Sequence, residues 1–63
     1  MLGEHVRNIR KKRGSTLKEL AEKTGLSIGY ISQIERDLTD PSLSTLRKLS
    51  AALDIPTYLF MGG

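Results

Sequence analysis

Gly29, Ser32, Gln33 and Arg36 are spaced so that they fall on one face of a short helix. The residues of this face are small or polar, whereas the opposite face of the same helix is apolar. Gln33 is the one outward side chain here that can form two parallel hydrogen bonds with a base edge, and adenine N6 and N7 are its natural partners. A short helix with such a face fits the major groove of duplex DNA, so the chemistry we expect is the reading of base edges.

The residues around Gln33 add little direct discrimination between bases. Ile28 either offers an apolar surface to a thymine methyl group or packs partly against the protein at the start of its helix. Ser32 can donate or accept a hydrogen bond and discriminates poorly, while Gly29 reads nothing but lets the helix backbone approach closely. These four residues are our predicted base-reading set. One glutamine contact is worth about 1–3 kcal/mol against the ~4–10 kcal/mol that separates specific from non-specific binding, so dimerisation and DNA shape must contribute much of the specificity.

A second group of residues is expected to contact the DNA backbone. Amide groups at the start of a helix bind anions without needing a basic side chain, and hydroxyl groups mark three predicted helix starts. Tyr30 either places its hydroxyl on a phosphate or packs as an aromatic residue at the edge of the core. The residues assigned to phosphate contact are Thr16, Lys18, Ser27, Tyr30, Arg36, Ser42 and Ser44.

Helices must carry these side chains, because the chain shows helical periodicity and no strand-like alternation. We predict a first helix over residues 3–13 that ends at Gly14. Thr16 and Glu19 fit a capping box that starts a second helix, and Gly25 ends that helix with a positive φ. Three more helices are predicted over residues 28–36, 43–53 and 56–61, with Ser27 and Ser42 as N-caps and Pro56 in the first position of the last helix.

Each predicted helix has an apolar stripe that would face a common core, and five such helices with short connections give a compact all-α bundle. The inward residues are Leu2, Val6, Ile9, Leu17, Leu20, Ala21, Thr24, Ile31, Ile34, Leu43, Leu46, Leu49, Ser50 and Leu53.

Two charged residues fall on inner edges rather than on the surface. Arg10 lies on the inner edge of the first helix, and Glu35 lies on the inner edge of the third. We predict a partly buried Arg10–Glu35 ion pair that ties the two helices together, and therefore count Arg10 as structural rather than as a DNA contact.

Residues 17–36 have the pattern of a helix-turn-helix motif. Two helices that cross at a steep angle need a small side chain at their closest approach and a glycine where the chain reverses. Ala21 and Gly25 meet these needs, and Ile31 and Ile34 anchor the second helix.

With these residues in place, the chain resembles the phage-repressor and Cro-like (XRE) family of helix-turn-helix proteins. Within that family it is most similar to SinR-like regulators and to regulators that carry a cupin sensor behind such a domain. The segments RNIRKKRGSTLKELAEKTGLSIGYISQIER and DPSLSTLRKLSAALDIPTYLF carry the resemblance. It implies a five-helix, lambda-repressor-like DNA-binding domain over residues 1–63. It also implies a two-fold dimer on an operator with symmetric half-sites, with the third helix in the major groove.

The chain departs from the family pattern at two places. Leu17 stands where the family often has a glutamine that braces the third helix and touches phosphate, and leucine can do neither. The loop before the fourth helix is often basic in the family, but here it contains Asp37 and Asp40. These carboxylates should repel the DNA backbone unless they turn away from it.

The C-terminal segment Tyr58, Leu59, Phe60 and Met61 is more apolar than a small monomer can cover. Either all four residues pack inward, or some complete the core and the others form a self-complementary patch. We assign Tyr58, Phe60 and Met61 to contacts in a homodimer, which a domain of this size could form mainly on DNA. The Gly62-Gly63 ending suggests a chain cut at a linker, although a small stand-alone repressor is an open alternative.

Composition narrows the remaining classes of function. The 63 residues carry a net charge of +3, and five of the ten Lys and Arg fall within residues 7–13, which suits either a polyanionic partner or a solvated helix face. There is no cysteine and one histidine, His5, so we expect no metal site and no cofactor. No apolar run approaches the ~20 residues that span a bilayer, so we expect a cytoplasmic protein without membrane contact.

No nucleophile–base pair, paired carboxylates or glycine-rich phosphate loop is visible, which argues against an enzyme. The alternative to a DNA-binding regulator is a helix-turn-helix fold that binds a protein partner, as in an antitoxin. Ile28, Gly29 and Leu17, together with the acidic loop, favour that alternative.

Overall fold

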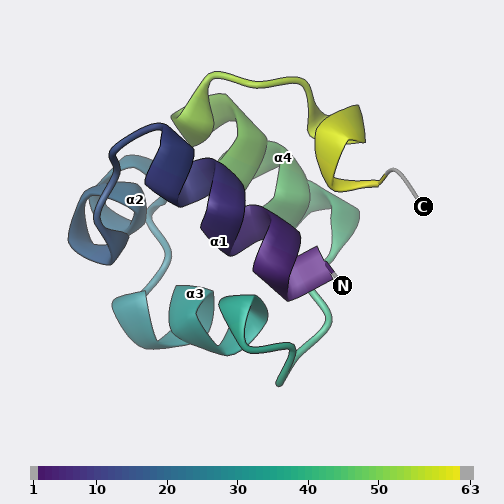
Figure 1. The fold of residues 1–63 in the computed structure, drawn as a ribbon. Coiled ribbons are helices and arrows are strands. Elements are labelled where there is room, and N and C mark those ends of the chain that lie inside the picture. The colour runs from purple at the N-terminus through teal and green to yellow at the C-terminus, as the bar shows by residue number, and fades with distance from the viewer. Residues whose placement is uncertain (1, 62–63) are drawn as a thin grey trace.

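The computed structural model describes residues 2–61, and within that range the chain forms helices and no strand. The elements in chain order are α1 (Leu2–Lys12), α2 (Leu17–Thr24), α3 (Ile28–Glu35), α4 (Leu43–Leu53) and the 3-10 helix η1 (Thr57–Phe60). Figure 1 shows α1 lying across the bundle, with α2 and the start of α4 near opposite ends of α3. None of these helices combines the length and the apolar character needed to cross a membrane.

The all-α prediction is confirmed, but the prediction of a fifth α-helix is wrong. Residues 57–60 form one 3-10 turn, in which the Leu59 N–H bonds to the Pro56 carbonyl at 3.2 Å. Pro56 precedes this turn with an extended ψ of 142° instead of occupying its first position. An element of four residues closes with i→i+3 bonds, as short helical segments commonly do. The expected linker at residues 62–63 lies outside the described part of the chain.

The predicted helix starts and the turn between α2 and α3 are present. Thr16 and Glu19 form the capping box: the Thr16 N–H donates to Glu19 Oε1 at 2.9 Å, and the Glu19 N–H donates to Thr16 Oγ1 at 3.0 Å. The Ser27 and Ser42 hydroxyl oxygens cap α3 and α4 by accepting the N–H groups of Tyr30 and Thr45. Gly25 ends α2 with φ of 75°, a backbone conformation that favours glycine.

The hydrogen bond from the Thr16 backbone holds the pKa of Glu19 below its usual range. Because the folded-state pKa is lowered, the carboxylate stabilises the capping box at neutral pH. This contribution is lost as the pH falls through the folded-state pKa.

The core contains side chains from all five elements, and most of the predicted inward residues are buried or half-buried. Leu43 is an exception: it is 45% exposed, because it lies in the first turn of α4 where the bundle ends. The buried apolar residues are Val6, Leu20, Ile31, Ile34, Leu46, Leu49, Leu53 and Phe60.

Phe60 is only 4% exposed, so its assignment to a dimer contact is wrong. A 3-10 helix has three residues per turn, and residues i and i+3 therefore share one side. Thr57 and Phe60 take the inner side of η1, where the Thr57 hydroxyl lies 2.7 Å from the hydroxyl of buried Ser50. Tyr58 and Leu59 are left facing outward.

The first turn of α1 packs closely against the end of α3. A Cβ added at Gly3 would clash with the Ile34 carbonyl oxygen and would lie 2.7 Å from that of Glu35. The Gly3 N–H also donates to Asp37 Oδ1 at 3.0 Å, so a carboxylate from the chain after α3 caps α1. The absence of a side chain at Gly3 is therefore what allows α1 to approach α3 this closely.

We predict that Gly3→Ala destabilises the protein by about 1–3 kcal/mol, because the new methyl group meets rigid backbone. Gly29→Ala is the matched control: its Cβ would meet nothing within 4 Å, so stability should stay the same or rise by up to about 1 kcal/mol. Urea unfolding of both variants measures the difference. Equal unfolding midpoints would show that the close approach at Gly3 contributes nothing.

Candidate nucleic-acid interface

Arg10 and Glu35 hold α3 in place against α1. Arg10 Nε donates to Glu35 Oε2 at 2.7 Å, and Arg10 Nη2 donates to Glu35 Oε1 at 3.1 Å, which makes the contact bidentate. Arg10 Nη1 also donates to the Ser15 carbonyl at 2.9 Å. The two side chains are only 11% and 5% exposed. The ion pair expected from the sequence is thus present, and it links α1, the loop before α2 and α3.

Within residues 2–61, no part of the chain covers the outward side of α3. Gly29, Gln33 and Arg36 are exposed, and Ile28 is 47% exposed at the first turn of the helix. Ser32 is half-buried, and it lines a hollow between α1, α2 and α3. Of the four predicted base-reading residues, three lie on open surface and Ser32 lies at its margin.

Three of the hydroxyl groups predicted to contact phosphate cap helices. The oxygens of Thr16, Ser27 and Ser42 accept backbone N–H groups from the first turns of α2, α3 and α4. Each is therefore fixed beside open helix-start N–H groups, which are the donors that bind anions. Lys18 and Ser44 are exposed close to two of these helix starts.

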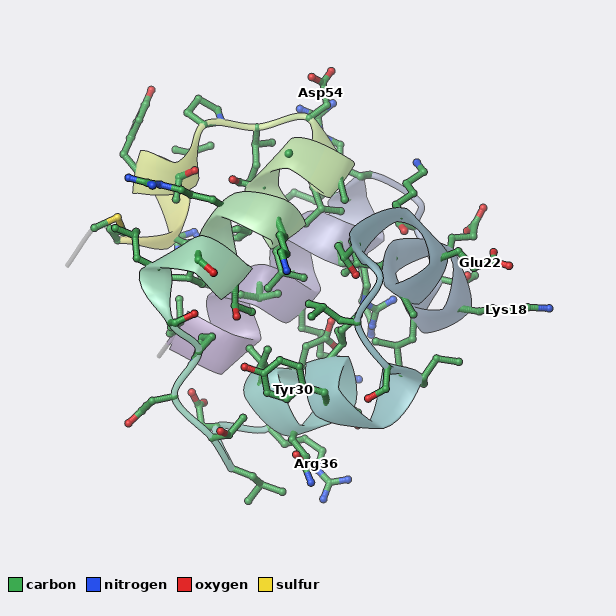
Figure 2. All side chains as sticks on the ribbon, turned by 180° about the vertical axis from the view of Figure 1, so that it is seen from behind. Lys18, Glu22, Tyr30, Arg36 and Asp54 are labelled. Carbon is green, nitrogen blue, oxygen red and sulfur yellow. The ribbon has the colours of Figure 1, made fainter. Side chains whose placement is uncertain are left out.

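Tyr30 and Arg36 lie differently on α3, as Figure 2 shows. Arg36 points away from the bundle, whereas the Tyr30 ring is half-buried and packs against the core. Lys18 extends from α2 into solvent. The structure thus favours the core-edge interpretation for the Tyr30 ring.

One carboxylate of the acidic loop after α3 is directed toward the protein itself. Asp37 turns its carboxylate toward the N–H of Gly3 at the start of α1. It does so with φ of 57°, in the left-handed region that Asp tolerates better than most residues. Asp40 is exposed. Leu17 is half-buried and packs against the core, so its side chain contributes packing rather than a polar contact.

Sequence reasoning missed three features of this region. The close approach at Gly3 and the role of Asp37 depend on two helices meeting end to end, which no local pattern reports. It also left Arg7 as one of several solvated charges, although Arg7 lines the hollow beside α3. The one available local signal was an Asp two residues after the last residue of α3, since Asp is among the residues enriched at positive φ.

The arrangement of α2, the turn at Gly25 and α3 agrees with what comparisons to known proteins show. The sequence profile of the helix-turn-helix family matches residues 6–60. The chain belongs to the helix-turn-helix family. The match covers α2, the turn at Gly25 and α3, and it confirms the resemblance seen in the sequence.

Two relatives of this helix-turn-helix chain are regulators by name. It is 44% identical over 62 residues to the HTH-type transcriptional regulator SinR of Bacillus subtilis (strain 168), covering 97% of this chain and 56% of SinR. It is also 44% identical over 61 residues to the immunity repressor protein of Bacillus phage phi105, covering 97% of this chain and 42% of that protein. The chain spans about half the length of the curated relatives it matches.

Solved structures of helix-turn-helix proteins have the same fold. The crystal structure of SinR, the master regulator for biofilm formation, in complex with DNA superposes with a TM-score of 0.91 at 43% identity, covering 98% of this chain and 100% of that one. The restriction-modification controller protein C.AhdI from Aeromonas hydrophila superposes with a TM-score of 0.90 at 32% identity, covering 94% and 89%.

We predict that Arg10→Met destabilises the protein by about 3–5 kcal/mol, because it leaves the buried Glu35 carboxylate without a partner. The double variant Arg10→Met/Glu35→Leu should recover most of that loss, because an apolar pair of similar volume removes the unpaired charge. Thermal and urea unfolding measure both variants. A single variant as stable as the unmodified protein would mean that the pair does not hold α3.

Proposed function

We propose that this chain binds duplex DNA sequence-specifically as a transcriptional regulator, acting as a repressor, with α3 in the major groove. The observation that supports this best is the uncovered outer face of α3 in a fold that superposes on SinR in complex with DNA at a TM-score of 0.91. The relatives named above are a transcriptional regulator and a repressor. On this proposal the chain acts in the cytoplasm and has no catalytic role.

In this proposal, Ile28, Gly29 and Gln33 face the bases, and Gln33 makes the one bidentate contact. The helix starts at Thr16, Ser27 and Ser42 approach phosphates through their open N–H groups, with Lys18, Ser44 and Arg36 adding polar or charged contacts. The exposed edge of Tyr30 lies against the same backbone.

Selection from random duplexes with the purified protein tests the function. Recovery of a common sequence, with an affinity that falls steeply as salt rises, supports the proposal. The expected slope of log K against log salt is roughly −0.9 per phosphate contacted. No enrichment, together with a shallow slope on every duplex, would instead favour a protein-binding role for the fold.

We predict that Gln33→Ala relaxes the base preference at one base pair per half-site, because the side chain makes a single two-bond contact worth about 1–3 kcal/mol. Stability should hardly change, since Gln33 is exposed. Repeating the selection with the variant measures the effect. An unchanged sequence logo would contradict the assignment of Gln33.

We also propose that two copies bind a symmetric operator through an apolar patch at η1. Tyr58 and Met61 are 69% and 59% exposed, and Leu59 lies between them in sequence at 38%. Leu59 thus takes the place that sequence reasoning gave to Phe60. A patch of three exposed residues suits a weak dimer that assembles on DNA. The half-sites of the operator would then be centred about 34–36 Å apart.

We predict that Tyr58→Ser/Met61→Ser weakens binding to a two-half-site duplex by at least about tenfold, because the two copies no longer support each other. Binding to a single half-site should be unchanged, and this measurement is the control. Unfolding should also be unchanged, since both side chains are exposed. Equal losses on both duplexes would place the effect in the monomer and contradict the dimer contact.

A further inference from the structure

An open hollow beside α3 carries an excess of positive charge. Its walls come from three helices, and the residues that line it include three arginines and one glutamate. They are Arg7, Arg10, Leu17, Ser32, Glu35 and Arg36.

Arg7 and Arg36 supply the free charge of this hollow. Arg10 and Glu35 are bound to each other, so their charges largely cancel. Within residues 2–61, neither the Arg7 nor the Arg36 side chain takes part in an ion pair or a hydrogen bond, and both residues are exposed. Two unpaired guanidinium groups, one on α1 and one on α3, therefore border the same open space.

The start of α2 borders the same hollow at Leu17. The capping box uses the N–H groups of Thr16 and Glu19. The N–H groups of Leu17 and Lys18 have no partner among the described residues, and Leu17 lines the hollow. Such open amides at a helix start favour an anion. The half-buried hydroxyl of Ser32 is a further donor on the α3 wall.

A neighbouring hollow shows why the first one is distinctive. Arg7 and Arg36 line this second hollow too, together with Lys11. Apart from Glu35, which Arg10 pairs, its lining has two carboxylates, Glu4 and Asp37, which offset two of the three positive charges. The electrostatic attraction between an anion and the two arginines is therefore stronger in the first hollow, which Leu17 and Ser32 line, than in the second.

We propose that the hollow bounded by α1, α2 and α3 seats one phosphate of the DNA backbone, bound by Arg7 and Arg36. In this arrangement Ser32 donates its hydroxyl to that phosphate and does not read a base. The assignment rests on the proposed DNA-binding function. It extends the contact surface to α1, outside the helix-turn-helix motif itself.

The test compares Arg7→Gln with Lys12→Gln. Each variant removes one exposed positive charge from α1, but Lys12 lines neither hollow. Binding is measured over a series of salt concentrations on the duplex recovered by selection, or on a mixed-sequence duplex at low salt if no sequence is preferred. Arg7→Gln should weaken binding roughly tenfold at moderate salt and reduce the slope by about 0.9, and Lys12→Gln should change both much less.

Two further measurements separate this assignment from other roles. Ser32→Ala should lower affinity equally on all sequences and leave the selected logo unchanged, in contrast to Gln33→Ala. Urea unfolding of Arg7→Gln should match that of the unmodified protein. Equal salt slopes for Arg7→Gln and Lys12→Gln, with the unmodified protein still binding DNA, would overturn the phosphate seat alone. An unmodified protein that binds no duplex would overturn the proposed function and this assignment together.

Discussion

The bidentate contact between Arg10 and Glu35 is the interaction on which the rest of the structure depends. It joins the first and third helices at a point almost closed to water, where a charge without a partner is costly. Arg10 also binds the Ser15 carbonyl in the loop that leads into α2. One side chain therefore fixes α3 and the approach to α2 together, and these are the two helices of the motif.

Around this contact, the starts of the four α-helices are capped by polar side chains. Each of α2, α3 and α4 begins with a hydroxyl residue that caps its own first turn, and α1 takes its cap from Asp37 beyond α3. This hydrogen bond directs the Asp37 carboxylate toward the start of α1, although the residue itself stays exposed.

Much of the fold could be predicted because its signals are local. The caps at Thr16, Ser27 and Ser42 and the glycine turn at Gly25 each depend on a few neighbouring residues, and all are present. Features that depend on packing between distant segments were out of reach, above all the end-on contact at Gly3. The error at Phe60 has the same cause: residues 58–61 are all largely apolar, and which of them turns inward depends on how η1 packs against α1 and α4.

In the candidate site, too, local features could be predicted from the sequence, whereas features set by packing between helices could not. Helical periodicity was sufficient to place Gly29 and Gln33 on the outward side of α3. The position of Ser32 at the margin of a hollow also depends on where α1 lies, and sequence periodicity within α3 carries no such information.

The outward side of α3 has a consequence for how the protein can change. Added atoms at Gly29 would meet nothing nearby, and Gln33 is fully outside the core, so both positions tolerate exchange without disturbing the scaffold. The outer face of α3 can therefore vary among descendants of this chain while the folded frame stays the same.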